Sequence, residues 1–191
     1  MQTPNYLFFF VGKIASGKET QSRRLADELG WEIFATGNRF REIIASGSPL
    51  GARIKDTYDK GLLMPSWVAD YMFEDFVFKL APEKGAIFEG SGRDLQQAKV
   101  IEEVSDFLGR PYRVFNLEIS DEEVMKRSLG RNRDKTDDPN VVETRLKEYT
   151  RLTKPAIEHF RSLGKCVDVD GEQTLEKVHE DVLAEVEKLL V

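Results

Sequence analysis

The sequence predicts an α/β fold, a doubly wound, five-stranded parallel sheet with helices on both faces. Short apolar runs alternate with longer stretches of helical period, which is the pattern of repeated βαβ units. A glycine-rich segment follows the first apolar run and precedes the first helical stretch. The chain has 191 residues, enough for one domain with a full hydrophobic core. We therefore expect a single domain over residues 1–191.

The first strand is predicted at residues 6–11, because this run is apolar throughout. Such runs are typical of central parallel strands that helices cover on both faces. Four weaker strands are predicted at residues 32–34, 86–88, 113–119 and 165–169.

Helical periodicity fills most of the chain between these strands. Pro155 lies inside the longest helical stretch, and its ring removes a hydrogen bond and clashes with the preceding turn. We therefore expect that helix to kink or split. The predicted helices cover residues 18–29, 39–45, 49–60, 66–80, 95–108, 121–130, 141–163 and 175–190.

The charge and the apolar runs exclude several classes of protein. The net charge is −6, and residues 168–191, with eight acidic and two basic side chains, account for all of it. A broad nucleic-acid surface would need a basic face. No apolar run approaches the length of a membrane span, no targeting segment is recognised, and one cysteine cannot form an intramolecular disulfide. We expect a cytoplasmic protein with no nucleic-acid and no membrane partner.

The glycine-rich segment Gly12-Lys13-Ile14-Ala15-Ser16-Gly17-Lys18-Glu19-Thr20 has the spacing of a phosphate-binding loop, or P-loop. In such a loop, backbone N–H groups surround a phosphate chain, the following helix adds positive charge, and the lysine reaches the terminal phosphates. The alternative is an ordinary glycine turn that joins a strand to a helix and binds no phosphate. The usual pattern has Ser or Thr directly after the lysine, whereas here Glu19 stands there and Thr20 comes one place later.

Segments from Tyr6 to about Gly171 resemble the adenylate kinases and their nucleoside monophosphate kinase relatives. The resemblance implies a helical NMP-binding insertion at residues 36–65 and a short lid at residues 131–140, without the cysteines of zinc-bearing lids. The matching segments are Thr20-Gln21, Thr36-Gly37-Asn38-Arg39-Phe40-Arg41, Gly61-Leu62-Leu63-Met64-Pro65, Glu89-Gly90-Ser91-Gly92-Arg93, Gln97-Ala98, Arg127-Ser128-Leu129-Gly130-Arg131, Asp137-Asp138 and Arg145.

The same resemblance implies two nucleotide sites with a set of catalytic cations between them. Arg127 would pack on the ATP adenine and Arg131 would contact its phosphates, while Thr36 and Gln97 would face the AMP base. Lys135 stands where the family has a lid arginine, for which Arg133 could substitute. The implied ATP site is Gly12, Ala15, Ser16, Gly17, Lys18, Glu19, Thr20, Arg127, Arg131 and Gln173; the AMP site is Thr36, Arg41, Leu62, Met64, Gly90, Arg93, Gln97, Lys135 and Arg145; the catalytic cations are Lys18, Arg93, Arg131, Arg133 and Arg145.

The implied reaction is reversible, magnesium-dependent phosphoryl transfer from ATP to AMP, giving two ADP. Magnesium would be held through phosphates and water and oriented by Glu89 and Thr20, no zinc is expected, and the family favours a monomer. One alternative is a UMP/CMP kinase or another small-molecule kinase of the same fold. Another is a catalytically weakened nucleotide-binding regulatory protein. Thr36 and Gln97 favour AMP, because the pyrimidine enzymes have alanine and asparagine there.

Several residues depart from the family pattern. For Glu19 we expect a carboxylate that faces outward and is neutralised by Lys13 or Arg23. Ala15 replaces a glycine, so it either avoids a positive φ or accepts strain of about 1 to 2 kcal/mol. Ser91-Gly92 replaces Phe-Pro, which we expect to loosen the support of the neighbouring arginine. Ile14 and Asn38 also differ from the family, and the two histidines, His159 and His179, are expected at the surface or at helix caps.

Overall fold

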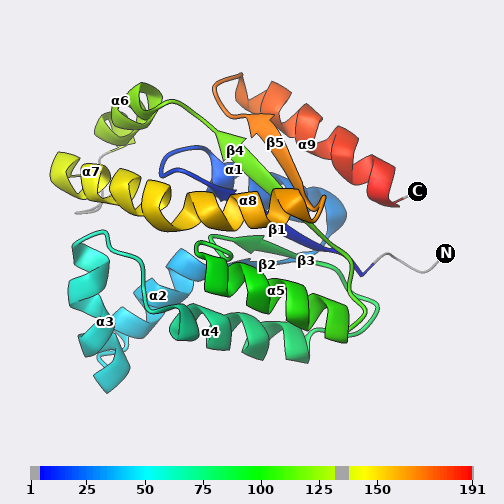
Figure 1. The fold of residues 1–191 in the computed structure, drawn as a ribbon, viewed down its shortest axis with the longest axis horizontal. Coiled ribbons are helices and arrows are strands. Elements are labelled where there is room, and N and C mark those ends of the chain that lie inside the picture. Colours follow the sequence, from blue (N-terminus) through cyan, green and yellow to red (C-terminus); the bar gives the residue numbers. More distant parts are fainter. Residues whose placement is uncertain (1–4, 132–137, 191) are drawn as a thin grey trace.

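The computed structural model describes residues 5–131 and 138–190, and it contains the predicted parallel sheet (Figure 1). The strand order is β2-β3-β1-β4-β5, and every neighbouring pair is parallel. Each strand begins and ends within one residue of its predicted bounds, so the predicted fold class is confirmed. The strands are β1 Leu7–Gly12, β2 Glu32–Ala35, β3 Ala86–Glu89, β4 Tyr112–Glu118 and β5 Cys166–Asp170.

Strand β1 lies in the middle of the sheet and is buried along its whole length. Phe9 packs into a core with helices α4 (Ser66–Lys79), α5 (Leu95–Phe107) and α8 (Lys154–Ser162). Phe8 points to the opposite face, where its core includes side chains of α1 (Lys18–Leu29) and α9 (Leu175–Leu190). This alternation explains why the β1 run is apolar at every position.

Helices α2 (Thr36–Ala45) and α3 (Pro49–Asp59) lie together at one end of the molecule (Figure 1). They share a small core of their own with the start of α4. Its buried members are Phe40, Ile54, Met64, Val68 and Ala69.

The long stretch predicted at residues 141–163 is divided, as Pro155 indicates. It forms α7 (Pro139–Glu148), a π-helical turn at Tyr149–Thr153, and α8, with Pro155 in the first turn of α8. Because proline has no N–H to donate, the backbone widens before it. Helix α6 (Asp121–Arg131) precedes the residues 132–137 that lie outside the described part of the chain.

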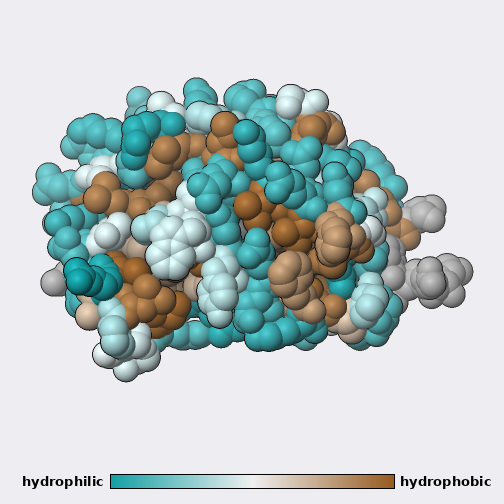
Figure 2. Space-filling model, turned by 60° about the horizontal axis from the view of Figure 1, so that its bottom comes forward, coloured by the Kyte–Doolittle hydropathy of each residue, from teal (hydrophilic) through white to brown (hydrophobic). Residues whose placement is uncertain are grey.

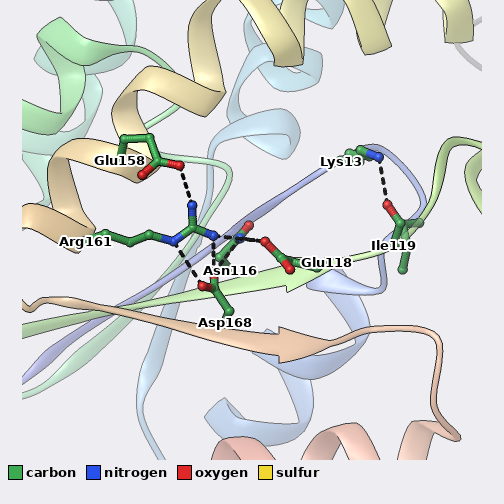
Figure 3. A network of polar contacts seen from close by, with 7 residues as sticks. All are labelled: Lys13, Asn116, Glu118, Ile119, Glu158, Arg161 and Asp168. Carbon is green, nitrogen blue, oxygen red and sulfur yellow. Dashed lines mark hydrogen bonds and ion pairs between the residues drawn. The ribbon is translucent and has the colours of Figure 1, made fainter.

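Arg161 joins α8 to the strands β4 and β5 (Figure 3). Its guanidinium donates to Asp168 of β5 at 2.6 and 3.0 Å, to Glu118 of β4 at 2.9 Å and to Glu158 at 2.6 Å. Asn116 donates to the same Glu118 and Asp168 carboxylates. This network fixes α8 against the sheet edge where the site described below begins.

His179 corrects one expectation, because it is buried between α9 and α1. Its Nδ1 lies 3.1 Å from Gln21 Oε1 and its Nε2 lies 2.9 Å from Glu28 Oε2. His159 pairs with Glu102 across 2.8 Å near the surface. The helical periodicity placed both histidines correctly on helices, but the partner helix that covers His179 comes from the other end of the chain.

The outer face of α4 carries exposed aromatic side chains, among them Trp67, Tyr71 and Phe78. Figure 2 looks onto this side of the molecule and shows apolar side chains in several patches, separated by hydrophilic ones. Among the helices that the structure describes, none is long and apolar enough to cross a membrane.

Asp70 on α4 predicts a pH-dependent stability. The pKa of this carboxyl is raised from 3.8 to about 6, mainly by burial and also by the charges of Asp94 and Glu74, while a hydrogen bond from Gln96 at 2.9 Å opposes the rise. The folded protein therefore binds this proton more tightly than the unfolded chain, so the ionised group costs stability above pH 6 and costs nothing below pH 4. Asp70→Asn should raise the free energy of unfolding by about 1 to 3 kcal/mol at pH 8 and leave it unchanged at pH 4.

Urea unfolding at the two pH values measures this effect. Asp75→Asn is the matched control, because Asp75 lies on the same helix but is exposed and paired with Lys79 at 2.6 Å. An equal gain from Asp70→Asn at both pH values would contradict the assignment of the effect to ionisation.

Candidate active site

The phosphate loop begins at the carboxyl edge of the sheet, where β1 lies between β3 and β4. Phe10 is in register with Glu89, the last residue of β3, and Gly12 is in register with Leu117 of β4. The loop after β1 and the segment after β3 therefore leave the sheet side by side. In doubly wound sheets, ligands bind at this edge where the strand order reverses.

The loop has the backbone that phosphate binding requires. Gly12 has φ 135°, and a Cβ at this position would lie 2.5 Å from the carbonyl oxygen of Leu117. Gly17 has φ 95° and directly precedes α1. The buried Lys18 donates its Nζ to the carbonyl of Lys13 and, at 3.3 Å, to Ser16 Oγ. Its ammonium group is thus held inside the curve of the loop, where a phosphate chain would lie.

Two charged residues of the loop have partners of their own. Lys13 donates to the carbonyl of Ile119 at 2.8 Å, as Figure 3 shows, and also pairs with Asp121. Glu19 pairs with Arg23, one turn along α1, at 3.1 Å. Of the two neutralising partners expected for Glu19, the structure shows Arg23, which reduces repulsion between its carboxylate and a bound phosphate.

Ala15 has φ 60°, so this alanine accepts the left-handed conformation that glycine adopts without strain. Left-handed backbone costs a non-glycine residue about 1 to 2 kcal/mol, while glycine costs about 0.4 to 1 kcal/mol in unfolded-chain entropy. Ala15→Gly should therefore raise the free energy of unfolding by about 0.5 to 1 kcal/mol. Chemical denaturation of the two proteins measures the difference.

Gly109→Ala provides the opposite change for comparison. Gly109 has φ 62°, and a Cβ added there would meet no atom within 4 Å, so the substitution causes no steric clash. This variant should lose about 1 kcal/mol. A destabilised Ala15→Gly protein would show that Ala15 is not strained.

A cavity of about 970 Å³ opens above the loop. The implied site residues whose side chains the structure describes all line it, including those far apart in the sequence. The side chain of Arg131, and the whole of Arg133 and Lys135, fall outside the described residues. The lining set includes Gly12, Ala15, Ser16, Gly17, Lys18, Glu19, Thr20, Thr36, Arg41, Leu62, Met64, Glu89, Gly90, Arg93, Gln97, Arg127, Arg145 and Gln173.

One end of the cavity is bounded by Arg127 and Gln173. Arg127 donates to the carbonyl of Gly171 at 3.0 Å and to Glu123 at 2.7 Å. Gln173 donates to Asp181 of α9 at 2.9 Å. These contacts place the flat guanidinium of Arg127 next to the loop that follows β5, an arrangement that suits stacking on a purine ring.

The insertion of α2 and α3 provides the wall opposite. Arg41 donates to Tyr58 Oη at 3.0 Å and to Asn38 Oδ1. Thr36 is buried and its hydroxyl lies 2.9 Å from that of Ser91. The sequence did not single out Tyr58, and it did not indicate a partner for Ser91. Ser91 is one of the departures from the family pattern, and its contact with Thr36 could not be read from spacing.

Arg93 faces the cavity from the segment after β3, and burial lowers its pKa while the charge of Glu89 opposes this. Its backbone is held on both sides, because its N–H donates to Gln97 Oε1 at 3.0 Å and its carbonyl accepts from Thr153 Oγ1 at 2.8 Å. Thr153 belongs to the π-helical turn. The support that Ser91-Gly92 was expected to loosen is thus supplied by two buried side chains.

Among the residues that the structure describes, few oxygen atoms at the cavity could serve magnesium. Within residues 5–131 and 138–190, no group of three or more His, Cys, Asp or Glu side chains is arranged to hold a metal. Glu89 and Thr20 line the same cavity as the loop. Magnesium commonly keeps several waters and takes one or two protein oxygens together with substrate phosphates, so this sparse donor set fits it.

A parallel sheet with a phosphate loop after β1, and a facing wall of arginines, defines a P-loop phosphotransferase. The sequence profile of the family described as "Adenylate kinase" matches residues 10–165. The chain is 32% identical to an adenylate kinase of Chlamydia pneumoniae, covering 95% of this chain and 97% of the relative. It is 35% identical to an adenylate kinase of Synechococcus sp. (93% and 94%) and 34% identical to adenylate kinase 1 of Synechocystis sp. (88% and 90%). The chain belongs to the adenylate kinase family, which confirms the resemblance.

Proposed function

We propose that this protein catalyses reversible transfer of the γ-phosphoryl group from magnesium-bound ATP to AMP, giving two ADP. One observation carries the proposal: a single cavity is lined by the phosphate loop on one side and by Arg41, Arg93 and Arg145 on the other. A donor and an acceptor phosphate bound there would both lie against cations. Family membership supports the same reaction.

The residues act by position and charge. In phosphoryl transfer the charge spreads over the equatorial oxygens, and little covalent chemistry is required of the protein. Lys18 would contact the donor phosphates, and Arg93 and Arg145 would bind the phosphate that is transferred. The planar fork of arginine grips two oxygens at once. No general base is needed, because the second pKa of a phosphate monoester is about 6 and the acceptor is already ionised at neutral pH.

Residues 36–65 form the proposed AMP-binding subdomain, and residues 131–140 the proposed lid, which would bring Arg131, Arg133 and Lys135 to the phosphates. Gly61 at the end of the insertion packs closely on α7, since a Cβ there would lie 2.7 Å from Val141 and 3.1 Å from Arg145. The insertion and the helix after the lid thus meet beside the cavity. A closed lid would exclude water and favour transfer over hydrolysis.

Magnesium would be held through phosphates and water, with Glu89 and Thr20 orienting it. When bound, it would neutralise charge that develops on the phosphate oxygens. No zinc is included in the proposal. A monomeric state and a cytoplasmic location stay predictions from the sequence.

The acceptor is proposed to be AMP, because Thr36 and Gln97 both line the cavity and the resemblance associates these residue types with AMP and not with a pyrimidine nucleotide. Purified protein should be incubated with magnesium and ATP plus AMP, dAMP, UMP or CMP, and ADP formation followed by chromatography. AMP should give the fastest turnover, far above a Lys18→Ala control. Faster turnover of UMP or CMP would support a pyrimidine kinase instead. Binding of ATP and AMP without turnover would support the regulatory alternative.

A further inference from the structure

We propose that Asp94 fixes the orientation of the Gln97 side-chain amide, and that this makes the acceptor site select a 6-aminopurine over a 6-oxopurine. The inference rests on the proposed function, because it takes Gln97 to face the base of the acceptor nucleotide. Asp94 is then a positioning residue for specificity, one that acts through Gln97.

The Gln97 side-chain amide is held by one hydrogen-bond acceptor and one hydrogen-bond donor. Its Nε2 donates to Asp94 Oδ2 at 2.7 Å, and its Oε1 accepts from the backbone N–H of Arg93 at 3.0 Å. Gln97 is 5% exposed and lines the cavity. A carboxylate can only accept hydrogen bonds and a backbone N–H can only donate one, so the amide has one permitted orientation. Rotation by 180° would place oxygen against the carboxylate and NH₂ against the N–H.

Asp94 is itself held in place. Its Oδ1 accepts from the backbone N–H of Gln97 at 2.9 Å, which caps the N-terminus of α5, and its Oδ2 also accepts from Ser66 Oγ at 2.7 Å. The side chain is 7% exposed. Because the Asp94 carboxylate accepts these hydrogen bonds and the one from Gln97 Nε2, it cannot rotate together with the Gln97 amide.

The fixed amide has one N–H and one oxygen lone pair still to satisfy. The edge of adenine offers an acceptor at N1 beside a donor at the 6-amino group, and both match the amide in its fixed orientation. Hypoxanthine has the same size and shape, but it offers a donor at N1 beside an acceptor at the 6-oxo group. A freely rotating amide would turn to suit either base, whereas this one mismatches hypoxanthine at both atoms.

The experiment compares equilibrium dissociation constants of AMP and inosine monophosphate, which differ only at this edge of the base. Asp94→Asn keeps an oxygen to cap α5, because asparagine is as good an N-cap as aspartate. The NH₂ of the new asparagine, however, would face the Gln97 amide. Residue 94 would then no longer require Gln97 to present its own NH₂ there. Wild-type protein should prefer AMP by about 10- to 100-fold, the discrimination expected of one bidentate contact to a base. Asp94→Asn should reduce that preference by about tenfold or more.

Asp70→Asn is the matched control, because Asp70 is the neighbouring buried carboxylate and accepts from Gln96 rather than from Gln97. It should leave the AMP preference unchanged within about twofold. If Asp94→Asn unfolds at the assay temperature, Asp94→Ser takes its place, since a hydroxyl caps the helix but both donates and accepts.

The outcomes separate the inference from the proposed function. An unchanged preference in a folded Asp94 variant overturns the inference, whatever the turnover. A preference that falls in the Asp94 variant alone supports it. AMP that binds to the wild-type protein without being phosphorylated contradicts the proposed function while the binding comparison still decides the role of Asp94. A wild-type protein that binds neither nucleotide overturns both.

Discussion

Lys18→Met is expected to lower kcat for ADP formation from ATP and AMP by about 10²- to 10³-fold. Lys18 is buried in the curve of the phosphate loop, and its Nζ is held by the Lys13 carbonyl and by Ser16 Oγ. A donor phosphate in the loop would take this ammonium as its main side-chain cation. Methionine has a similar length and no charge, so the loop should keep its shape while charge stabilisation in the transition state is lost.

Lys13→Met is the control for that prediction, because it removes a lysine of the same loop. The Lys13 ammonium is bound to the Ile119 carbonyl and to Asp121, and this residue does not line the main cavity. We expect kcat to fall by less than about tenfold, well under the loss from one transition-state donor. Steady-state rates at saturating nucleotide distinguish the two variants. Equal losses would contradict the assignment of the donor-phosphate cation to Lys18.

Arg93→Lys is expected to lower kcat by about 10²-fold or more, although the charge is kept. Arg93 is proposed to grip the transferred phosphate with its planar fork, and lysine offers a single point of contact. The backbone around residue 93 should not move, since Gln97 and Thr153 hold its N–H and its carbonyl. The loss should therefore fall on kcat, with little change in the free energy of unfolding.

Arg110→Lys tests whether such a loss is specific to the cavity. Burial lowers the pKa of Arg110 as it does that of Arg93, but its guanidinium donates to the backbone carbonyls of Lys84, Leu80 and Ala81. This variant should lose about 1 to 3 kcal/mol of stability, because buried acceptors lose their donors, and its kcat should stay near wild type. Parallel kinetic and denaturation measurements give both quantities. A loss of kcat as large as that of Arg93→Lys would indicate a general effect on folding.

The secondary structure was predictable to a large extent, because its signals are local. The apolar run at residues 6–11 predicted β1, and a helix was predicted at residues 18–29, the bounds of α1. The π-helical turn was not predicted, although Pro155 indicated a break. A proline indicates that a regular helix is interrupted. The backbone conformation at the interruption, however, also depends on the contact of Thr153 with the segment after β3.

From the sequence, the candidate site was predictable only as a set of residue types and not as an arrangement in space. The spacing of Gly12, Gly17 and Lys18 predicted a phosphate loop, since a loop between adjacent elements is a local feature. Arg41, Arg93 and Arg145 could be proposed as partners only through a family resemblance. The sheet order and the placement of the insertion bring them to one cavity, and these depend on contacts between distant segments.

The alternation of strands and helices, the phosphate loop, and the location of the acidic surplus in residues 168–191 were therefore all predictable from the sequence. These features arise from residues next to one another along the chain. The positive φ of Ala15, the burial of His179 and the contact of Asp94 with Ser66 became evident only from the folded structure. The backbone angle is imposed by the closed shape of the loop. The polar contacts depend on which donors and acceptors the fold brings within about 3 Å, a distance that sequence separation does not determine.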